Sequence, residues 1–110
     1  MPTVPKKLDQ ARWAKLSLAE KIGNIGSEFS RAKSAEQRND WEKRQAALER
    51  ALDLIDLSLA GDFVPAHRKE LARLRSLSAN CYINGDEFEV TLQQLEDYTF
   101  SFALLARSGK

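Results

Sequence analysis

Large apolar side chains recur every three or four residues between positions 17 and 34, the spacing of one face of a helix. They are Leu18, Ile22, Ile25 and Phe29. A row of small residues lies one position further round the same helix: Ala19, Gly23, Gly26 and Ser30. A glycine inside a helix costs about 1 kcal/mol relative to alanine. We therefore expect the backbone of another helix to approach this row closely, which would offset that cost.

Three further stretches show helical periodicity, at residues 40–60, 64–82 and 91–107. The expected apolar rows are Trp41, Leu48, Leu52, Ile55 and Leu59, then His67, Leu71, Leu74, Ser78 and Cys81, then Leu92, Leu95, Tyr98, Phe102, Leu105 and Ala106. A shorter helical segment over residues 9–16 would carry Trp13 to the core.

Helix starts and stops divide these stretches. Ser17–Glu20 and Thr91–Gln94 each have the pattern of a capping box. Gly61 followed by Asp62 predicts a helix end, Pro65 a helix start, and residues 84–86 a turn. The polar stretch 34–39 indicates either a weak break or a continuation of the preceding helix.

No useful stretch alternates apolar and polar residues, so an all-α fold is expected. Four helices joined by short loops predict an antiparallel up-down-up-down four-helix bundle over residues 9–107. Residues 1–8 contain Pro2 and Pro5, and are expected to form a disordered tail.

Some large apolar residues fall on the back faces of the second and fourth expected helices, towards the same end of the bundle: Leu54, Leu57, Phe100 and Leu104. An exposed apolar patch on a small domain usually marks an interface, and a two-fold homodimer is the commonest way to bury it. The alternative is a wide core that covers these residues within one chain.

Composition narrows the class of protein. The chain has 110 residues, enough for one domain, with 17 basic and 16 acidic residues. Nucleic-acid binders usually carry a basic excess, which is absent overall, although a local patch is compatible with this balance. No signal peptide or membrane span is recognisable, and the single cysteine forms no intramolecular disulfide. We expect a cytoplasmic protein without a membrane contact.

Candidate chemistry is sparse. His67 and Cys81 lie about 20 Å apart along one expected helix, too far to act together. The helical metal-site pattern Glu-x-x-His is missing, so neither a metal nor another cofactor is expected. Charged residues predict either a polar pocket or ordinary ion pairs: Glu28, Asp53, Asp56, Arg68 and Arg75. With Glu49, these carboxylates leave a magnesium or nucleotide enzyme as a weaker possibility.

Several short motifs resemble a small family of uncharacterised bacterial and archaeal helical proteins. They are Trp13, Leu16-Ser17-Leu18-Ala19-Glu20, Asn24-Ile25-Gly26-Ser27-Glu28, residues 50–57, Tyr82, Gly85-Asp86 and the closing residues 102–107. The resemblance covers residues 12–107 and implies no activity. In shape alone, the expected bundle is similar to HEPN domains, S23-like proteins and the accessory bundle of diversity-generating retroelements. The Arg-to-His motif of HEPN ribonucleases is missing before His67.

The pattern as a whole predicts a non-enzymatic interaction protein that self-associates, with a dimer favoured, or binds a protein partner. The alternative is a nucleic-acid accessory protein that uses the cations of the third helix: Arg68, Lys69, Arg73 and Arg75.

Overall fold

All regular structure in the described part of the chain is α-helical, which confirms the all-α prediction. The computed structural model describes the backbone of residues 6–84 and 90–108. The helices are α1 (Lys6–Ala14), α2 (Leu18–Gln37), α3 (Trp41–Gly61), α4 (Pro65–Tyr82) and α5 (Leu92–Ser108). The expected short helix over residues 9–16 is α1, which begins at Lys6. Residues 1–5 of the expected tail lie outside the described residues.

Side-chain capping explains where the helices begin. Ser17 accepts a hydrogen bond from the Glu20 backbone N–H, and Glu20 accepts one from the Ser17 N–H, which completes the predicted capping box. Thr91 and Gln94 form the second predicted box in the same reciprocal way. Pro65 opens α4, where its missing N–H costs nothing.

Two of the described turns place an asparagine in the left-handed region. Of the alternatives at 34–39, the helix continues to Gln37, and the chain reverses at 38–40 with Asn39 at φ 59°. Asn84 has φ 56° and follows Ile83, the residue that caps the end of α4. The short polar side chain of asparagine tolerates this conformation better than most residues do. The rest of the predicted 84–86 turn lies outside the described residues.

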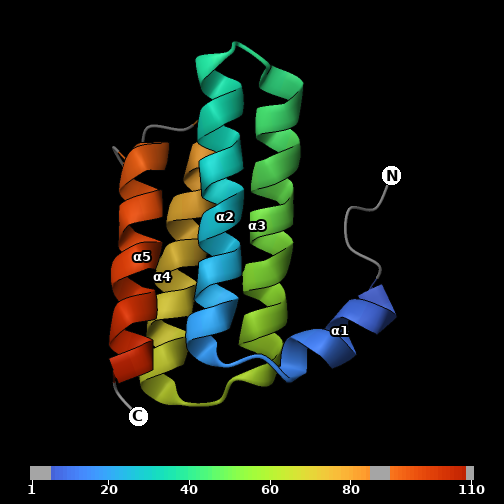
Figure 1. Cartoon of the computed structure of the whole chain (residues 1–110), viewed down its shortest axis with the longest axis vertical. Coiled ribbons are helices and arrows are strands. Elements are labelled where there is room, and N and C mark those ends of the chain that lie inside the picture. Colours follow the sequence, from blue (N-terminus) through green and yellow to red (C-terminus); the bar gives the residue numbers. More distant parts are fainter. Residues whose placement is uncertain (1–5, 85–89, 109–110) are drawn as a thin grey trace.

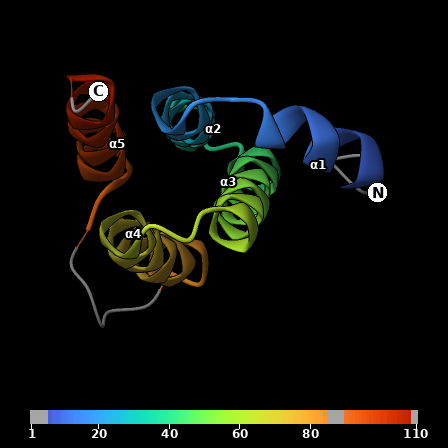
Figure 2. The same ribbon diagram turned by 90° about the horizontal axis from the view of Figure 1, so that it is seen from below.

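The four long helices lie along the longest axis of the molecule, and α1 projects to one side (Figure 1). Viewed from below, α2, α3, α4 and α5 occupy four corners, and α1 lies beyond α3 (Figure 2). Helix α2 packs against both α3 and α5, whereas α4 packs mainly on α3 and contacts α5 far less. Helix α2 is therefore the element that joins α3 and α5.

The apolar row of α2 forms the centre of the core, as predicted: Ile22, Ile25 and Phe29 are fully buried. The predicted row of α3 is partly wrong. Trp41 is 49% exposed at the start of the helix, with the Arg44 guanidinium 4.2 Å from its ring centroid. The buried face instead consists of Arg44, Ala47, Leu48, Ala51, Ile55 and Ser58. Ala47, Ala51 and Ser58 on this face allow a neighbouring helix to pack closely, so this face is buried although larger apolar residues lie beside it.

The predicted core face of α5 also needs correction. Leu105 is 70% exposed, while Leu92, Leu95 and Thr99 are buried. Thr99 satisfies its hydroxyl within the helix, by donating to the Leu95 and Glu96 carbonyls, and so tolerates burial.

Within the described residues, no helix combines the length and the apolar character needed to span a membrane.

Candidate functional site: two grooves beside helix α2

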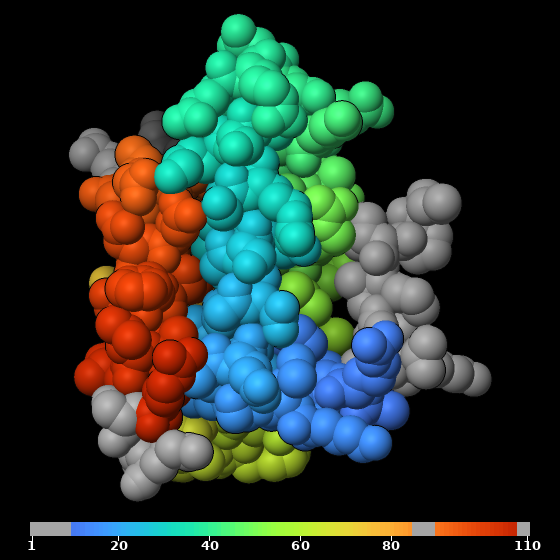
Figure 3. Space-filling model, in the orientation of Figure 1, coloured from blue at the N-terminus to red at the C-terminus, as the bar shows by residue number. Residues whose placement is uncertain are grey.

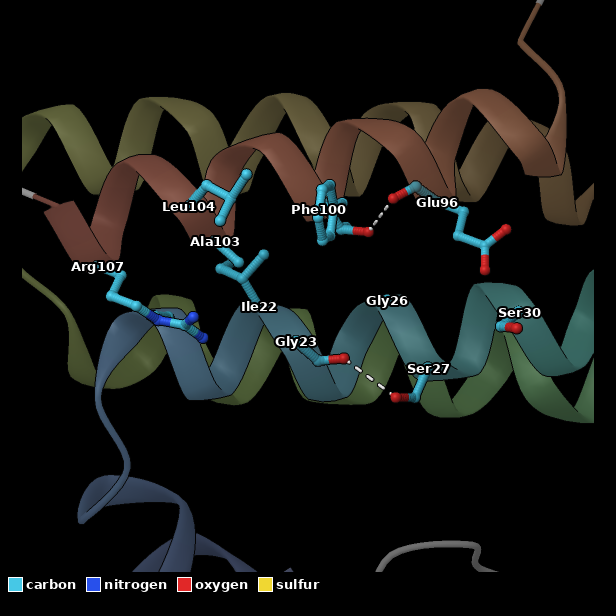
Figure 4. Close-up of a pocket in the computed structure, with 12 residues that line it drawn as sticks. Ile22, Gly23, Gly26, Ser27, Ser30, Glu96, Phe100, Ala103, Leu104 and Arg107 are labelled. Atoms are coloured by element: carbon cyan, nitrogen blue, oxygen red, sulfur yellow. Dashed lines mark hydrogen bonds between the residues drawn. The ribbon is translucent and has the colours of Figure 1, made fainter.

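The small-residue row of α2 lines a groove against α5 (Figure 4). The groove has a volume of about 360 Å³. Four of its lining residues are the predicted row: Ala19, Gly23, Gly26 and Ser30. From α5, Phe100 and Leu104 line the same groove, so the structure brings the small-residue row together with half of the predicted interface.

The two glycines of the row differ in their surroundings. A Cβ built on Gly26 would lie 2.7 Å from the Thr99 hydroxyl oxygen and 3.3 Å from its Cβ, so α5 leaves no room for a side chain there. At Gly23, among the described atoms, nothing lies within 4 Å of the corresponding position. Close helix packing therefore accounts for Gly26, whereas Gly23 keeps the groove open.

Exposed apolar side chains and charged residues complete the groove. Phe100 is 67% and Leu104 47% exposed. Glu96 and Arg107 lie at opposite ends of the α5 side (Figure 4). Lys33 of α2 donates to Glu96 over 2.7 Å, and this hydrogen bond lowers the pKa of the Glu96 carboxyl. The groove is thus apolar in the middle and charged at its ends.

The other half of the predicted interface faces elsewhere. Leu54 and Leu57 are partly buried against the core, and each lines a hollow that also contains Trp13. The Trp13 indole N–H donates to the Ser58 hydroxyl over 3.0 Å, which holds α1 against α3. Helix α1 therefore lies beside Leu54 and Leu57, and the four residues do not line one groove.

The charged residues of the predicted polar pocket form separate contacts. Glu28 accepts from Arg31 at 2.9 Å and from Arg50 at 3.0 Å, and is 8% exposed. Asp56 forms a two-point ion pair with Arg75, and the hydrogen bond raises the pKa of Arg75. Asp53 is exposed and acts on Arg75 only through its charge.

Arg68 is directed to the last turn of α3 and the loop after it, where it donates to the Leu59 and Asp62 carbonyls. The five predicted residues are thus distributed over three places. The described residues contain no group of three or more potential ligands arranged to hold a metal ion.

A second groove, between α2 and α3, was missed by the sequence argument. Two adjoining hollows of about 710 and 470 Å³ share Arg31 and follow the boundary between the two helices. Their cationic lining residues are Arg12, Lys15, Arg31, Arg38, Lys43 and Arg50. The signal that could have found them is a spacing of seven residues, nearly two helical turns, from Arg31 on α2 to Arg38 at its C-cap and from Lys43 to Arg50 on α3.

Residues with catalytic potential hold structural positions. Burial raises the pKa of the Cys81 thiol, which favours the protonated and less nucleophilic form. Arg44, 2% exposed, donates to the Cys81 carbonyl at 3.1 Å and to Glu36 at 3.2 Å, and so joins the ends of three helices. His67 contacts Asp62 at 2.8 Å beside the α3–α4 loop.

Comparison of the chain with protein-family models, with curated proteins and with solved structures finds no match. The resemblance to the family with the Asn-Ile-Gly-Ser-Glu motif therefore stays a prediction.

Proposed function

We propose that this chain is an interaction protein whose α2/α5 groove binds a second copy of itself. The observation that carries the proposal is the position of Phe100 and Leu104, which are exposed beside the small-residue row of α2. Contiguous exposed apolar surface on a small domain commonly marks a binding site. A different protein partner is the alternative occupant.

The proposal includes an antiparallel up-down-up-down four-helix bundle for α2 to α5, with α1 as an appendage. Two connections of only three residues, 38–40 and 62–64, support this arrangement, because short loops place consecutive helices side by side in opposite directions. A cytoplasmic location is part of the proposal, and the free, buried Cys81 is compatible with it.

Charges on α5 favour a second copy as the occupant. Glu96, Phe100, Leu104 and Arg107 follow one another at spacings of four, four and three residues, and so lie on one helix face. The midpoint between Glu96 and Arg107 falls between Phe100 and Leu104. A two-fold axis at this midpoint would pair antiparallel α5 helices, so that each Glu96 faces Arg107 of the other copy and each Phe100 faces Leu104.

Replacement of both apolar residues tests this proposal. The variant Phe100→Ser with Leu104→Ser is expected to shift the dissociation constant of the dimer by about 100-fold or more, because burial of each side chain contributes about 1.5–3 kcal/mol. Sedimentation velocity over a concentration series from low to high micromolar measures the shift. Both side chains are at least 47% exposed, so the monomer should stay folded.

Phe63→Ser is the matched control, because Phe63 is 78% exposed but lies between α3 and α4, away from the groove. It should leave the dimer intact.

The antiparallel orientation of the two α5 helices has its own test. Arg107→Glu and Glu96→Arg should each weaken the homodimer, and an equimolar mixture of the two variants should restore association. A wild-type chain that stays monomeric at high micromolar concentration contradicts self-association.

The nucleic-acid alternative based on α4 has less support. Arg68 and Arg75 are engaged by carbonyls and by Asp56, while Lys69 and Arg73 are exposed. Two exposed cations are a small electrostatic footprint for nucleic-acid binding.

A further inference from the structure

The α2/α3 groove gathers six of the 17 Lys and Arg residues of a chain whose net charge is only +1. Among its described lining residues the acidic side chain is Glu28, which is already paired with Arg31 and Arg50. The groove therefore carries a local positive charge that the composition conceals. It flanks α2 on the side of α3, whereas the α2/α5 groove flanks α2 on the side of α5, and Ser27 and Ser30 of α2 border both. Helix α2 occupies the middle of the molecular face that Figure 3 shows.

The cations follow the groove as a line. Arg31 lies on α2 and Arg38 is the residue that caps the C-terminal end of α2, while Lys43 and Arg50 are seven residues apart and so lie on one face of α3. The loop 38–40 joins the two helices, so Arg38 and Lys43 lie at one end. Arg12 and Lys15 line the other end, beside α1. From Glu28 to Arg38 the helical rise alone spans about 15 Å.

Glu28 holds the two arginine side chains in the middle of this line of cations. Its carboxylate accepts from Arg31 Nη1 and Arg50 Nε, and so fixes both guanidinium groups at the groove. Each guanidinium has five N–H donors, of which Glu28 engages one. The remaining donors suit the bidentate geometry of a phosphate.

We propose that the α2/α3 groove binds the phosphodiester backbone of a single-stranded nucleic acid. A linear series of cations matches a linear series of phosphates, whereas a small anion would need converging donors. The Ser34 hydroxyl lines the same hollow as Arg38 and Lys43 and is a typical backbone-contacting group. The groove offers a single line of cations, which matches the one phosphate line of an extended strand better than the two phosphate lines of a duplex.

Binding of this kind depends steeply on salt. For single strands, the logarithm of the binding constant falls with the logarithm of the salt concentration with a slope of about −0.7 per neutralised phosphate. Engagement of four to six cations predicts a slope of about −3 to −4. Affinity should therefore fall by about 60- to 250-fold between 50 and 200 mM NaCl.

A charge-reversal pair gives the decisive experiment. Arg38→Glu with Lys43→Glu removes two exposed cations from the groove. Lys69→Glu with Arg73→Glu is the matched control, because it makes the same change in net charge at exposed positions of α4. Fluorescence anisotropy of a labelled oligodeoxythymidine of about 15 nucleotides measures binding to the full chain. Thermal unfolding of each variant verifies that it is folded.

The expected result is a loss of affinity of at least about tenfold for the groove variant at 50 mM NaCl, and of less than about threefold for the control. No binding by the wild type, or equal loss in both variants, overturns the proposal. So does tighter binding of a duplex, or equal competition by an acidic polypeptide of the same length. The proposal does not rest on self-association, because Phe100→Ser with Leu104→Ser leaves every cation of the groove in place.

Discussion

At the scale of single residues, Gly23 and Gly26 show that two identical residues on one helix face can have different physical roles. Both carry the entropic cost of glycine in a helix. Only at Gly26 does another helix fill the space of the missing side chain, through the Thr99 hydroxyl. Thr99 is held by hydrogen bonds to two carbonyls of its own helix, so rotating it away would break them.

Alanine substitutions should therefore have opposite effects. Gly23→Ala is expected to raise the free energy of unfolding by about 0.5–1 kcal/mol, because alanine is the better helix former and the position is open. Gly26→Ala is expected to lower it by about 1–2 kcal/mol through overpacking against Thr99. Urea denaturation measures both. Equal effects of the two substitutions would contradict the assigned close contact.

The double variant Gly26→Ala with Thr99→Ala separates overpacking from other causes. In the Thr99→Ala background, Gly26→Ala should no longer destabilise the protein, which gives a favourable coupling in the double-mutant cycle.

At the scale of helices, α1 depends on few contacts. Among the described helices, α1 packs mainly against α3. The contact centres on Trp13, which is 8% exposed and donates to Ser58. An element with so little buried surface opens more easily than the rest of the fold. Detachment of α1 would expose Leu54 and Leu57 and remove Arg12 and Lys15 from the α2/α3 groove.

Ser58→Ala tests this dependence. Loss of the acceptor leaves the buried indole N–H unpaired, which costs about 1–3 kcal/mol, and α1 should detach before the longer helices unfold. Faster tryptic cleavage after Arg12 and Lys15 would report detachment. Ser78→Ala is the matched control, because Ser78 is equally buried and donates to the carbonyl four residues earlier, as Ser58 does. Equal cleavage of both variants would contradict the role of Ser58.

The contact between α2 and α5 should weaken in acid. Lys33 lowers the pKa of the Glu96 carboxyl in the folded state. A carboxyl with a lowered folded pKa stabilises the fold fully above its unfolded pKa, and this contribution is lost as the pH falls through the folded value.

Glu96→Gln should therefore lower stability at pH 6–7 by about 1 kcal/mol or less, as expected for a partly exposed pair. As the pH falls from 6–7 through the lowered folded pKa of Glu96, the difference between variant and wild type should disappear. Thermal unfolding across this pH range measures it. Asp97→Asn, at the exposed neighbouring position, serves as the control. A constant difference at all pH values would contradict the ion-pair explanation.

At the scale of the whole molecule, helix positions were predictable because caps and breakers are local. Ser17, Thr91 and Pro65 each act within one turn, so their pattern identifies the helix starts without knowledge of the fold. The core face of α2 was equally predictable, since large apolar residues repeat there without ambiguity.

The faces of α3 and α5 were harder to predict, because burial there depends on which neighbour lies closest. Arg44 and Thr99 are polar but buried, through hydrogen bonds to carbonyls that no spacing rule identifies. The α2/α3 groove depends on two helices facing each other, so a charge balance summed along the chain conceals it. Glu28 was singled out by sequence, but its partners proved to be Arg31 and Arg50 rather than Arg68 or Arg75.

The contrast between the two tryptophans provides a built-in optical reporter. Trp13 is buried between α1 and α3, whereas Trp41 is 49% exposed at the start of α3. Iodide in solution should therefore quench Trp41 first and reach Trp13 only when α1 moves away. A Trp41→Phe variant would leave Trp13 as the single tryptophan. Its emission wavelength and its quenching would then report the position of α1 without an attached label, while a ligand is added to either groove.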